Sequence, residues 1–108
     1  MIKVLIVDDS AFMRKVIKKA IKKQPDMEVI AIARNGINAI KKIKKYSPDV
    51  ITMDIEMPQK NGLETLKALT NNKSFCTPII MVSALDNQHT VMDALDLGAF
   101  DFIPKPSD

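Results

Sequence analysis

Five polar side chains stand where apolar runs of the sequence end. They are Asp8, Asp9, Asp54, Ser83 and Lys105. If the fold brings the three carboxylates together, two of them about 4 Å apart repel by roughly 4 kcal/mol at an effective dielectric near 20, so the site requires a cation. Ligands that are all oxygen favour Mg²⁺, which binds one or two carboxylates and keeps several waters. These residue types therefore predict a magnesium site.

The same residues supply the parts that phosphoryl transfer needs. Asp54 can be a nucleophile that forms an acyl phosphate, with Lys105 as the cation and Ser83 as the hydroxyl donor. Each residue has an ordinary explanation when it is considered alone, because Asp often caps a helix, Ser often lies in a turn and Lys is common at surfaces. Their placement after different strands of one sheet favours the functional interpretation.

Alternating apolar runs and amphipathic segments predict the elements that would position these residues. Strands are expected at residues 3–7, 29–33, 50–53, 79–82 and 100–103, with a helix after each of the first four. Ser10 is expected to cap the first helix, Asn35-Gly36 to form a turn, and Gly98 to end the fourth helix. Because the strands are apolar throughout, they predict a parallel sheet that is covered on both faces.

The fold class that follows is α/β, with a doubly wound five-stranded parallel sheet, because crossovers between parallel strands are right-handed. In such sheets, ligands bind beyond the carboxyl ends of the strands, which is where all five candidate residues are expected. The length of 108 residues suits a single domain, residues 1–108.

The distribution of charge and the composition argue against a protein that binds nucleic acid or spans a membrane. Residues 1–54 have 12 basic and 6 acidic side chains, and residues 55–108 have 4 and 7. Most of the basic excess is lysine opposite the apolar stripes of the first two helices, which predicts solvated helix faces and not a surface that binds nucleic acid. No run reaches the roughly 18 apolar residues of a membrane span. Met1 leads directly into a strand and Cys76 has no partner for an internal disulfide, so we expect a cytoplasmic protein without a leader.

Four segments resemble the receiver domain of two-component response regulators. They are VLIVDDSAFMR, DVITMDIEMPQKNGLE, IIMVSA and GAFDFIPKP. The resemblance covers nearly the whole chain and implies a flavodoxin-like receiver fold. It implies that Asp54 is the phosphoacceptor for a histidine kinase, and that Ser83 and Lys105 sense the phosphate. It also implies that Phe102 is a switch aromatic, whose ring changes rotamer when Ser83 moves.

The resemblance further implies the ligands of the metal. Mg²⁺ would be held by Asp9, Asp54 and the backbone carbonyl of Glu56, with Asp8 acting partly through water. The family pattern also implies a cis peptide bond at Lys105-Pro106, a geometry that a minority of bonds before proline adopt.

The segments DDSAFMRKVI, DIEMP and DFIPKPS resemble most the amino-terminal receiver of chemotaxis protein-glutamate methylesterases. This resemblance implies an output domain and a role in chemotaxis adaptation through control of a methylesterase. The chain itself is expected to be no enzyme, because the catalytic Ser and His of that esterase would lie in a separate domain. The family has a fifth helix after the Lys-Pro turn, whereas this sequence ends at Asp108. We therefore expect a receiver fold that lacks the fifth helix, with apolar surface on the sheet face beside the first helix.

Three other functions stay open. A stand-alone chemotaxis regulator would have a similar first motif. A Mg²⁺-dependent phosphatase with an aspartyl nucleophile is the second alternative, because DIE (Asp54 to Glu56) faintly resembles the D-x-D motif of that class. That motif usually follows the first strand, which disfavours this function, and sustained turnover of a phosphomonoester would identify it. A nucleotide-binding module of the same fold is disfavoured, because Asp8 and Asp9 take the place of a glycine-rich loop and would repel phosphate.

Overall fold

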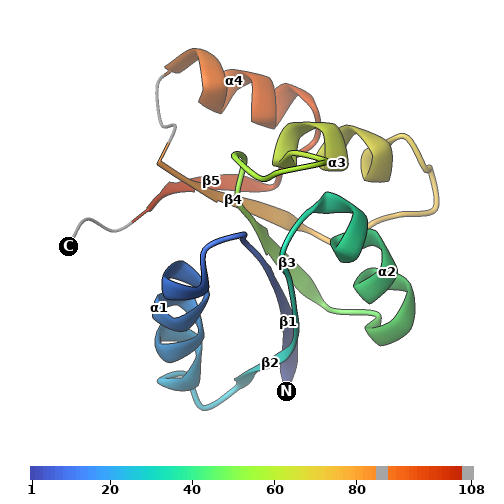
Figure 1. The fold of residues 1–108 in the computed structure, drawn as a ribbon. Helices are drawn as coiled ribbons and strands as arrows, with labels where there is room; N and C mark the ends of the chain where they lie inside the picture. The colour runs from blue at the N-terminus through green and yellow to red at the C-terminus, as the bar shows by residue number, and fades with distance from the viewer. Residues whose placement is uncertain (85–87, 106–108) are drawn as a thin grey trace.

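Nine elements alternate between strand and helix in the computed structural model, which describes residues 1–84 and 88–105 (Figure 1). The strands are β1 (Ile2–Val7), β2 (Met27–Ala33), β3 (Val50–Met53), β4 (Ile79–Ser83) and β5 (Asp101–Pro104). The helices are α1 (Ala11–Lys22), α2 (Gly36–Tyr46), α3 (Gly62–Thr70) and α4 (Gln88–Asp96). The alternation predicted from the apolar runs is confirmed.

All five strands are parallel and lie in the order β2-β1-β3-β4-β5. The chain therefore moves outward from β1 to β2 and then returns past β1 to build the other half of the sheet. In Figure 1, α1 lies on one side of the sheet and α2, α3 and α4 lie on the other. This reversal of direction confirms the doubly wound α/β fold.

Alternate residues of β1 contribute to two separate cores. Val4 and Ile6 pack with Ile21 of α1, whereas Leu5 and Val7 belong to the larger core on the opposite face. All four strand residues are almost wholly buried, and burial of each such side chain stabilises the fold by about 1.5–3 kcal/mol. A strand that is buried on both faces explains why this run has no polar alternation.

The hydrogen-bond ladder continues past the strand ends and brings the next residues to one edge of the sheet. Three main-chain bonds do this: Asp8 N to Ala33 O at 3.0 Å, Asp54 N to Val7 O at 2.9 Å, and Lys105 N to Ser83 O at 3.0 Å. Backbone hydrogen bonds alone therefore fix the positions of the residues that carry the charges, independently of contacts between their side chains.

Capping side chains begin the helices that leave this edge. The predicted cap of α1 is confirmed, since Ser10 Oγ accepts a hydrogen bond from Met13 N at 3.2 Å. Asn35 caps α2 by accepting from Asn38 N at 2.8 Å, so Asn35-Gly36 opens a helix and does not form the separate turn that the dipeptide predicts. Gly98 follows α4 with a φ of 107°, as expected for a residue that ends a helix.

Strand β3 has its predicted bounds, whereas the other four strands differ from theirs by one or two residues: β1 and β2 begin one and two residues early, β4 ends one residue late, and β5 is shifted by one. Ser83 is the last residue of β4 and not the first residue after it, because it pairs with Pro104. Strand β5 correspondingly runs from Asp101 to Pro104. Proline is tolerated there because β5 is an edge strand, where a missing N–H group breaks no central ladder.

The lysines of α1 and α2 lie mostly at the surface, as the sequence predicts. Lys42 Nζ and Lys45 Nζ lie over the Tyr46 ring, 5.7 and 5.3 Å from its centre, which is within the range of a cation–π contact. Within the described ranges, no helix has the length and apolarity that a bilayer crossing demands.

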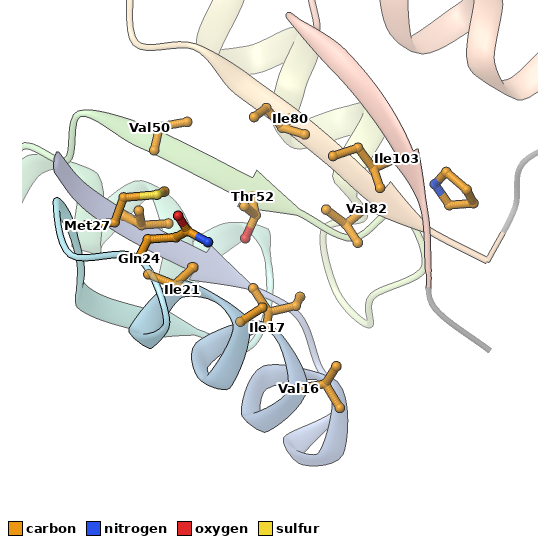
Figure 2. Close-up of a pocket in the computed structure, with 13 residues that line it drawn as sticks. Val16, Ile17, Ile21, Gln24, Met27, Val50, Thr52, Ile80, Val82 and Ile103 are labelled. Carbon is orange, nitrogen blue, oxygen red and sulfur yellow. The ribbon is translucent and has the colours of Figure 1, made fainter. Parts of the chain in front are cut away.

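An apolar groove of about 370 Å³ lies between α1 and the sheet (Figure 2). Val16, Ile17 and Ala20 line it from α1, and Val82 and Ile103 line it from the far half of the sheet. Thr52 also faces the groove, and its buried Oγ1 has no hydrogen-bond partner among the residues that the structure describes. The expected apolar surface beside the first helix is therefore present.

A charge placed in this groove is expected to reduce binding of an apolar fluorescent dye. Ala20 is exposed and lines the groove, so Ala20→Glu puts a carboxylate there without a cost in helix propensity above a few tenths of a kcal/mol. The dye ANS should show enhanced fluorescence with the parent chain and several-fold less with Ala20→Glu, because a charge opposes apolar binding.

Lys22→Gln is the matched control, because it changes the net charge by the same amount on the outer side of α1. It should leave the dye signal as it is in the parent. Equal fluorescence from Ala20→Glu and the parent would show that the dye binds elsewhere.

Candidate functional site

Three carboxylates converge at the carboxyl edge of the sheet. One oxygen from each of Asp8, Asp9 and Asp54 lies within 4.8 Å of the other two. Asp8 and Asp54 are 1% and 3% exposed, whereas Asp9 is exposed to solvent. The predicted proximity of the three side chains is therefore found, and only one of them faces water freely.

Asp8 is held by contacts on both its main chain and its side chain. Its Oδ1 accepts a hydrogen bond from Ser10 N at 2.9 Å, and its carbonyl oxygen accepts one from Arg14 Nη1 at 2.9 Å. Its Oδ2 is buried and lies 3.2 Å from Lys105 Nζ. That contact is an ion pair without the geometry of a hydrogen bond, so Oδ2 retains its capacity to accept.

Lys105 places its ammonium between two carboxylates. Its Nζ lies 3.2 Å from Asp54 Oδ2 and 3.2 Å from Asp8 Oδ2. Burial lowers the pKa of Lys105, but the attraction of Asp54 and then of Asp8 outweighs burial and raises that pKa above its ordinary value. Lys105 is therefore a fixed positive charge at neutral pH.

The pKa of Asp54 is raised above its ordinary value of 3.8. Burial is the largest cause, and the negative charge of Asp8 adds to it. Lys105 and the backbone N–H of Ile55 lower the pKa, but by less than burial and Asp8 raise it. The positive charge of Lys105 therefore does not balance the negative charges of the three carboxylates.

The chemistry of the donor set suits a hard divalent cation. When all are ionised, Asp8, Asp9, Asp54 and Lys105 carry a net charge of −2, which one divalent ion would balance. The donors are carboxylate oxygens, and the buried Oδ2 of Asp8 has no hydrogen bond. Oxygen donors favour Mg²⁺ over zinc, and His89 lies apart on α4, where it pairs with Asp93 at 3.3 Å. The residues present therefore fit Mg²⁺.

The other predicted residues lie around this cluster. Ser83 is wholly buried at the end of β4, and its carbonyl oxygen accepts from the backbone N–H of Lys105. Phe102 is half-buried in β5 and packs against the larger core. Glu56 is exposed and lines a hollow of about 500 Å³ together with Asp9. The predicted cis bond at Lys105-Pro106 falls outside the described residues.

Two contacts near the cluster were not predicted from the sequence. The Arg14 guanidinium fixes the carbonyl of Asp8 from the first turn of α1. Gly62 N donates to Ile55 O at 2.8 Å, and a Cβ on Gly62 would collide with the carbonyl oxygen of Asp54. The only signals in the sequence are an arginine one turn after a helix cap and a glycine eight residues after an aspartate, and neither specifies a contact.

The arrangement can stabilise negative charge that develops beside Asp54. The Asp54 carboxylate is a potential nucleophile, the Lys105 ammonium lies within ion-pair distance of it, and Asp9 opens the cluster to solvent. A group with three equatorial oxygens, such as a phosphoryl group, would meet a cation on one side and a metal-binding set on the other.

Comparison with known proteins agrees with this geometry. The family described as response regulator receiver domain matches residues 4–108. The chain is 52% identical to a protein-glutamate methylesterase/protein-glutamine glutaminase of Pyrococcus horikoshii, over 98% of the chain and 29% of that relative. The chain thus spans less than a third of the length of this curated relative.

Solved structures give the same result for the fold. The response regulator domain of Thermotoga maritima CheB has a TM-score of 0.90 and 50% identity, with 98% of this chain and 79% of that chain covered. A CheX-CheY-BeF₃-Mg²⁺ complex from Borrelia burgdorferi has a TM-score of 0.85 and 37% identity, with 98% and 79% covered. The resemblance seen in the sequence motifs is confirmed.

Replacing Asp54 with Asn is expected to raise the free energy of unfolding at neutral pH, in the absence of divalent cations. The raised pKa means that the folded protein binds the proton of Asp54 more tightly than the unfolded chain does. Stability of the parent therefore falls as the pH rises from 3.8 through the raised pKa, and then levels off. The amide does not titrate, so the gain should be greatest at neutral pH and should vanish below pH 3.8.

Urea unfolding with a chelator present measures this difference. Asp26→Asn is the control, because Asp26 is exposed at the opposite end of the strands and should show no gain. A lower stability of Asp54→Asn at neutral pH would mean that the pair with Lys105 outweighs burial.

Proposed function

This chain belongs to the response regulator receiver domain family, and we propose that it is a phosphorylation switch of a two-component system. In this proposal, Asp54 accepts a phosphoryl group from the phosphohistidine of a histidine kinase in a Mg²⁺-dependent reaction. The observation that carries the proposal is the convergence of Asp54 with Lys105, Asp8 and Asp9 at one edge of the sheet. Residues 1–108 act as a single receiver domain.

The transfer step is a displacement at phosphorus. A carboxylate oxygen of Asp54 attacks the phosphorus atom, a P–O bond forms, and the P–N bond of the donor breaks. The imidazole nitrogen leaves with the electron pair and takes up a proton from solvent. Lys105 Nζ, already 3.2 Å from Asp54 Oδ2, neutralises charge on the transferring oxygens, and Ser83 donates a hydrogen bond to one of them.

Asp9, Asp54 and the backbone carbonyl of Glu56 are the proposed Mg²⁺ ligands, with Asp8 acting partly through water. The bound ion would supply positive charge next to the phosphoryl oxygens. The buried Oδ2 of Asp8, which pairs with Lys105 but accepts no hydrogen bond, and the solvent exposure of Asp9 support this assignment. A structural relative at 37% identity was solved with Mg²⁺ and BeF₃, which is a further reason to assign the metal here.

Ser83 and Phe102 are the proposed switch residues. A phosphoryl group on Asp54 draws the Ser83 hydroxyl toward it, and the Phe102 ring changes rotamer as Ser83 moves. Phe102 pairs with Met81 across β4 and β5 and packs against the larger core, so its rotamer is coupled to the position of β4. The outer surface of α4 and β5 is then the face whose conformation changes when Asp54 is phosphorylated.

We further propose that the switch controls a methylesterase output domain and thereby chemotaxis adaptation. The curated relatives that match along this chain are named as methylesterases, and the chain corresponds to only 29% of the first of them. Ester hydrolysis would belong to that other part of such a protein, and this chain would supply its regulation.

Phosphoramidate, whose P–N bond resembles that of phosphohistidine, is expected to add one phosphoryl group to the chain. Intact mass spectrometry should detect a single adduct with Mg²⁺ present and none with a chelator. Asp54→Asn should abolish the adduct, because an amide is not a nucleophile at phosphorus. Asp26→Asn, the exposed control, should behave as the parent does.

An adduct that persists in Asp54→Asn would contradict the assignment of the nucleophile. Steady release of phosphate from a phosphomonoester, with turnover numbers well above one, would instead favour a phosphatase. A purified histidine kinase that transfers its phosphoryl group to the parent and not to Asp54→Asn would establish the class of donor.

A further inference from the structure

We propose that Gly36, the first residue of α2, is a positioning residue for the loop that borders the metal site. The loop spans residues 55–61 and connects β3 to α3. Gly36 touches no carboxylate of the cluster, so its effect would pass through the loop. This inference rests on the proposed function, because it concerns the Mg²⁺ affinity of the same site.

The loop forms a wall of the acidic cluster. A hollow of about 500 Å³ is lined by Asp9, Glu56 and Pro58. A second hollow, of about 470 Å³, is lined by Asp9, Pro58 and Gln59. Because both hollows include Asp9 and Pro58, a shift of the loop changes the surroundings of the exposed carboxylate directly.

The inner end of the loop is fixed by the site itself. Gly62 N donates to Ile55 O at 2.8 Å, and the backbone of Gly62 lies against the carbonyl oxygen of Asp54, where a Cβ would collide. The inner end therefore cannot move independently of Asp54. Any adjustment of the loop must occur along its outer part, at Gln59 and Lys60.

The outer part of the loop is held by the start of α2. Gly36 N donates to Lys60 O at 3.1 Å. A Cβ on Gly36 would collide with Thr65 Oγ1, and would lie 2.7 Å from Lys60 O and 3.0 Å from Lys60 Cβ. Asn35 Nδ2 adds a hydrogen bond to Gln59 Oε1 at 3.2 Å. The start of α2 and the loop are thus in direct backbone contact.

Position 36 requires glycine because there is no room for a Cβ atom. The φ of Gly36 is not in the left-handed region; among the described glycines, only Gly98 has such a φ. Glycine lowers helix stability by up to about 1 kcal/mol relative to alanine, so helix propensity does not favour it at the start of α2. What it provides is close approach to Lys60 O. The adjacent Gln59 has a φ of 68°, a conformation that a non-glycine residue keeps only when its surroundings hold it.

A methyl group at position 36 should therefore weaken Mg²⁺ binding by displacing the loop. We expect Gly36→Ala to raise the dissociation constant for Mg²⁺ about tenfold, the lower end of the range for loss of an outer support of a metal site. The measurement is an NMR titration of Mg²⁺ into the labelled protein, which follows the amide shifts around Asp54 without any phosphodonor.

Gly98→Ala is the matched control. The substitution is the same, and it is strained by the positive φ and by Thr70 at 2.9 Å, but it lies on the α4–β5 connection away from the loop. Both variants should unfold at lower temperature than the parent. The proposal is supported if only Gly36→Ala loses Mg²⁺ affinity, and it is overturned if both lose it equally or if neither does.

A second variant covers the case in which Gly36→Ala does not fold. Asn35→Ser keeps a good helix cap but removes the amide that reaches Gln59. It should weaken Mg²⁺ binding by a smaller factor than Gly36→Ala, and parental affinity would overturn the proposal. If the parent shows no Mg²⁺ binding, the proposed metal site is overturned together with the role of Gly36. If the parent binds Mg²⁺, the metal site stands, and the variants test only the role of Gly36.

Discussion

The balance between one ammonium and two buried carboxylates is the interaction on which this structure depends. Lys105 Nζ lies 3.2 Å from both Asp8 and Asp54, which are almost wholly buried. Without Lys105 the two carboxylates would repel in a region that water screens poorly. With it the cluster still has excess negative charge, because one ammonium faces two carboxylates and Asp9 adds a third. The carboxylate cluster can therefore form in the folded state, but it still favours the binding of a further cation.

The parallel sheet makes this balance possible, because it brings residues from distant parts of the sequence to one edge. Each of Asp8, Asp54 and Lys105 donates its backbone N–H to a neighbouring strand. The charges follow β1, β3 and β5, so their relative positions depend on the registers of the β1–β3, β3–β4 and β4–β5 pairs, and a slip of one residue in any of these would separate them. Burial of β1 on both faces provides the free energy that holds the register.

Much of the fold could be predicted from the sequence, because the apolar periodicity that marks strands and helices is a local pattern. The run Val4–Val7 predicts a buried strand, and the aspartates that follow it predict an acidic edge. The burial of Asp8 and the exposure of Asp9 could not be predicted from the residue types, since they depend on how the chain leaves β1. The approach of Gly36 to the β3–α3 loop is likewise a tertiary contact, and no periodicity encodes it.

Strand β5 joins the charged edge to both faces of the sheet. Its last residue, Pro104, precedes Lys105 and lines the apolar groove beside α1. Ile103 faces the same groove, whereas Phe102 packs against the core on the α4 side. Because Phe102 and Ile103 lie on opposite faces of β5, a displacement of this strand moves side chains in both layers at once. In the proposed switch, this short edge strand is the element that would connect a change in charge at Asp54 to the helical face on one side and to the apolar groove on the other.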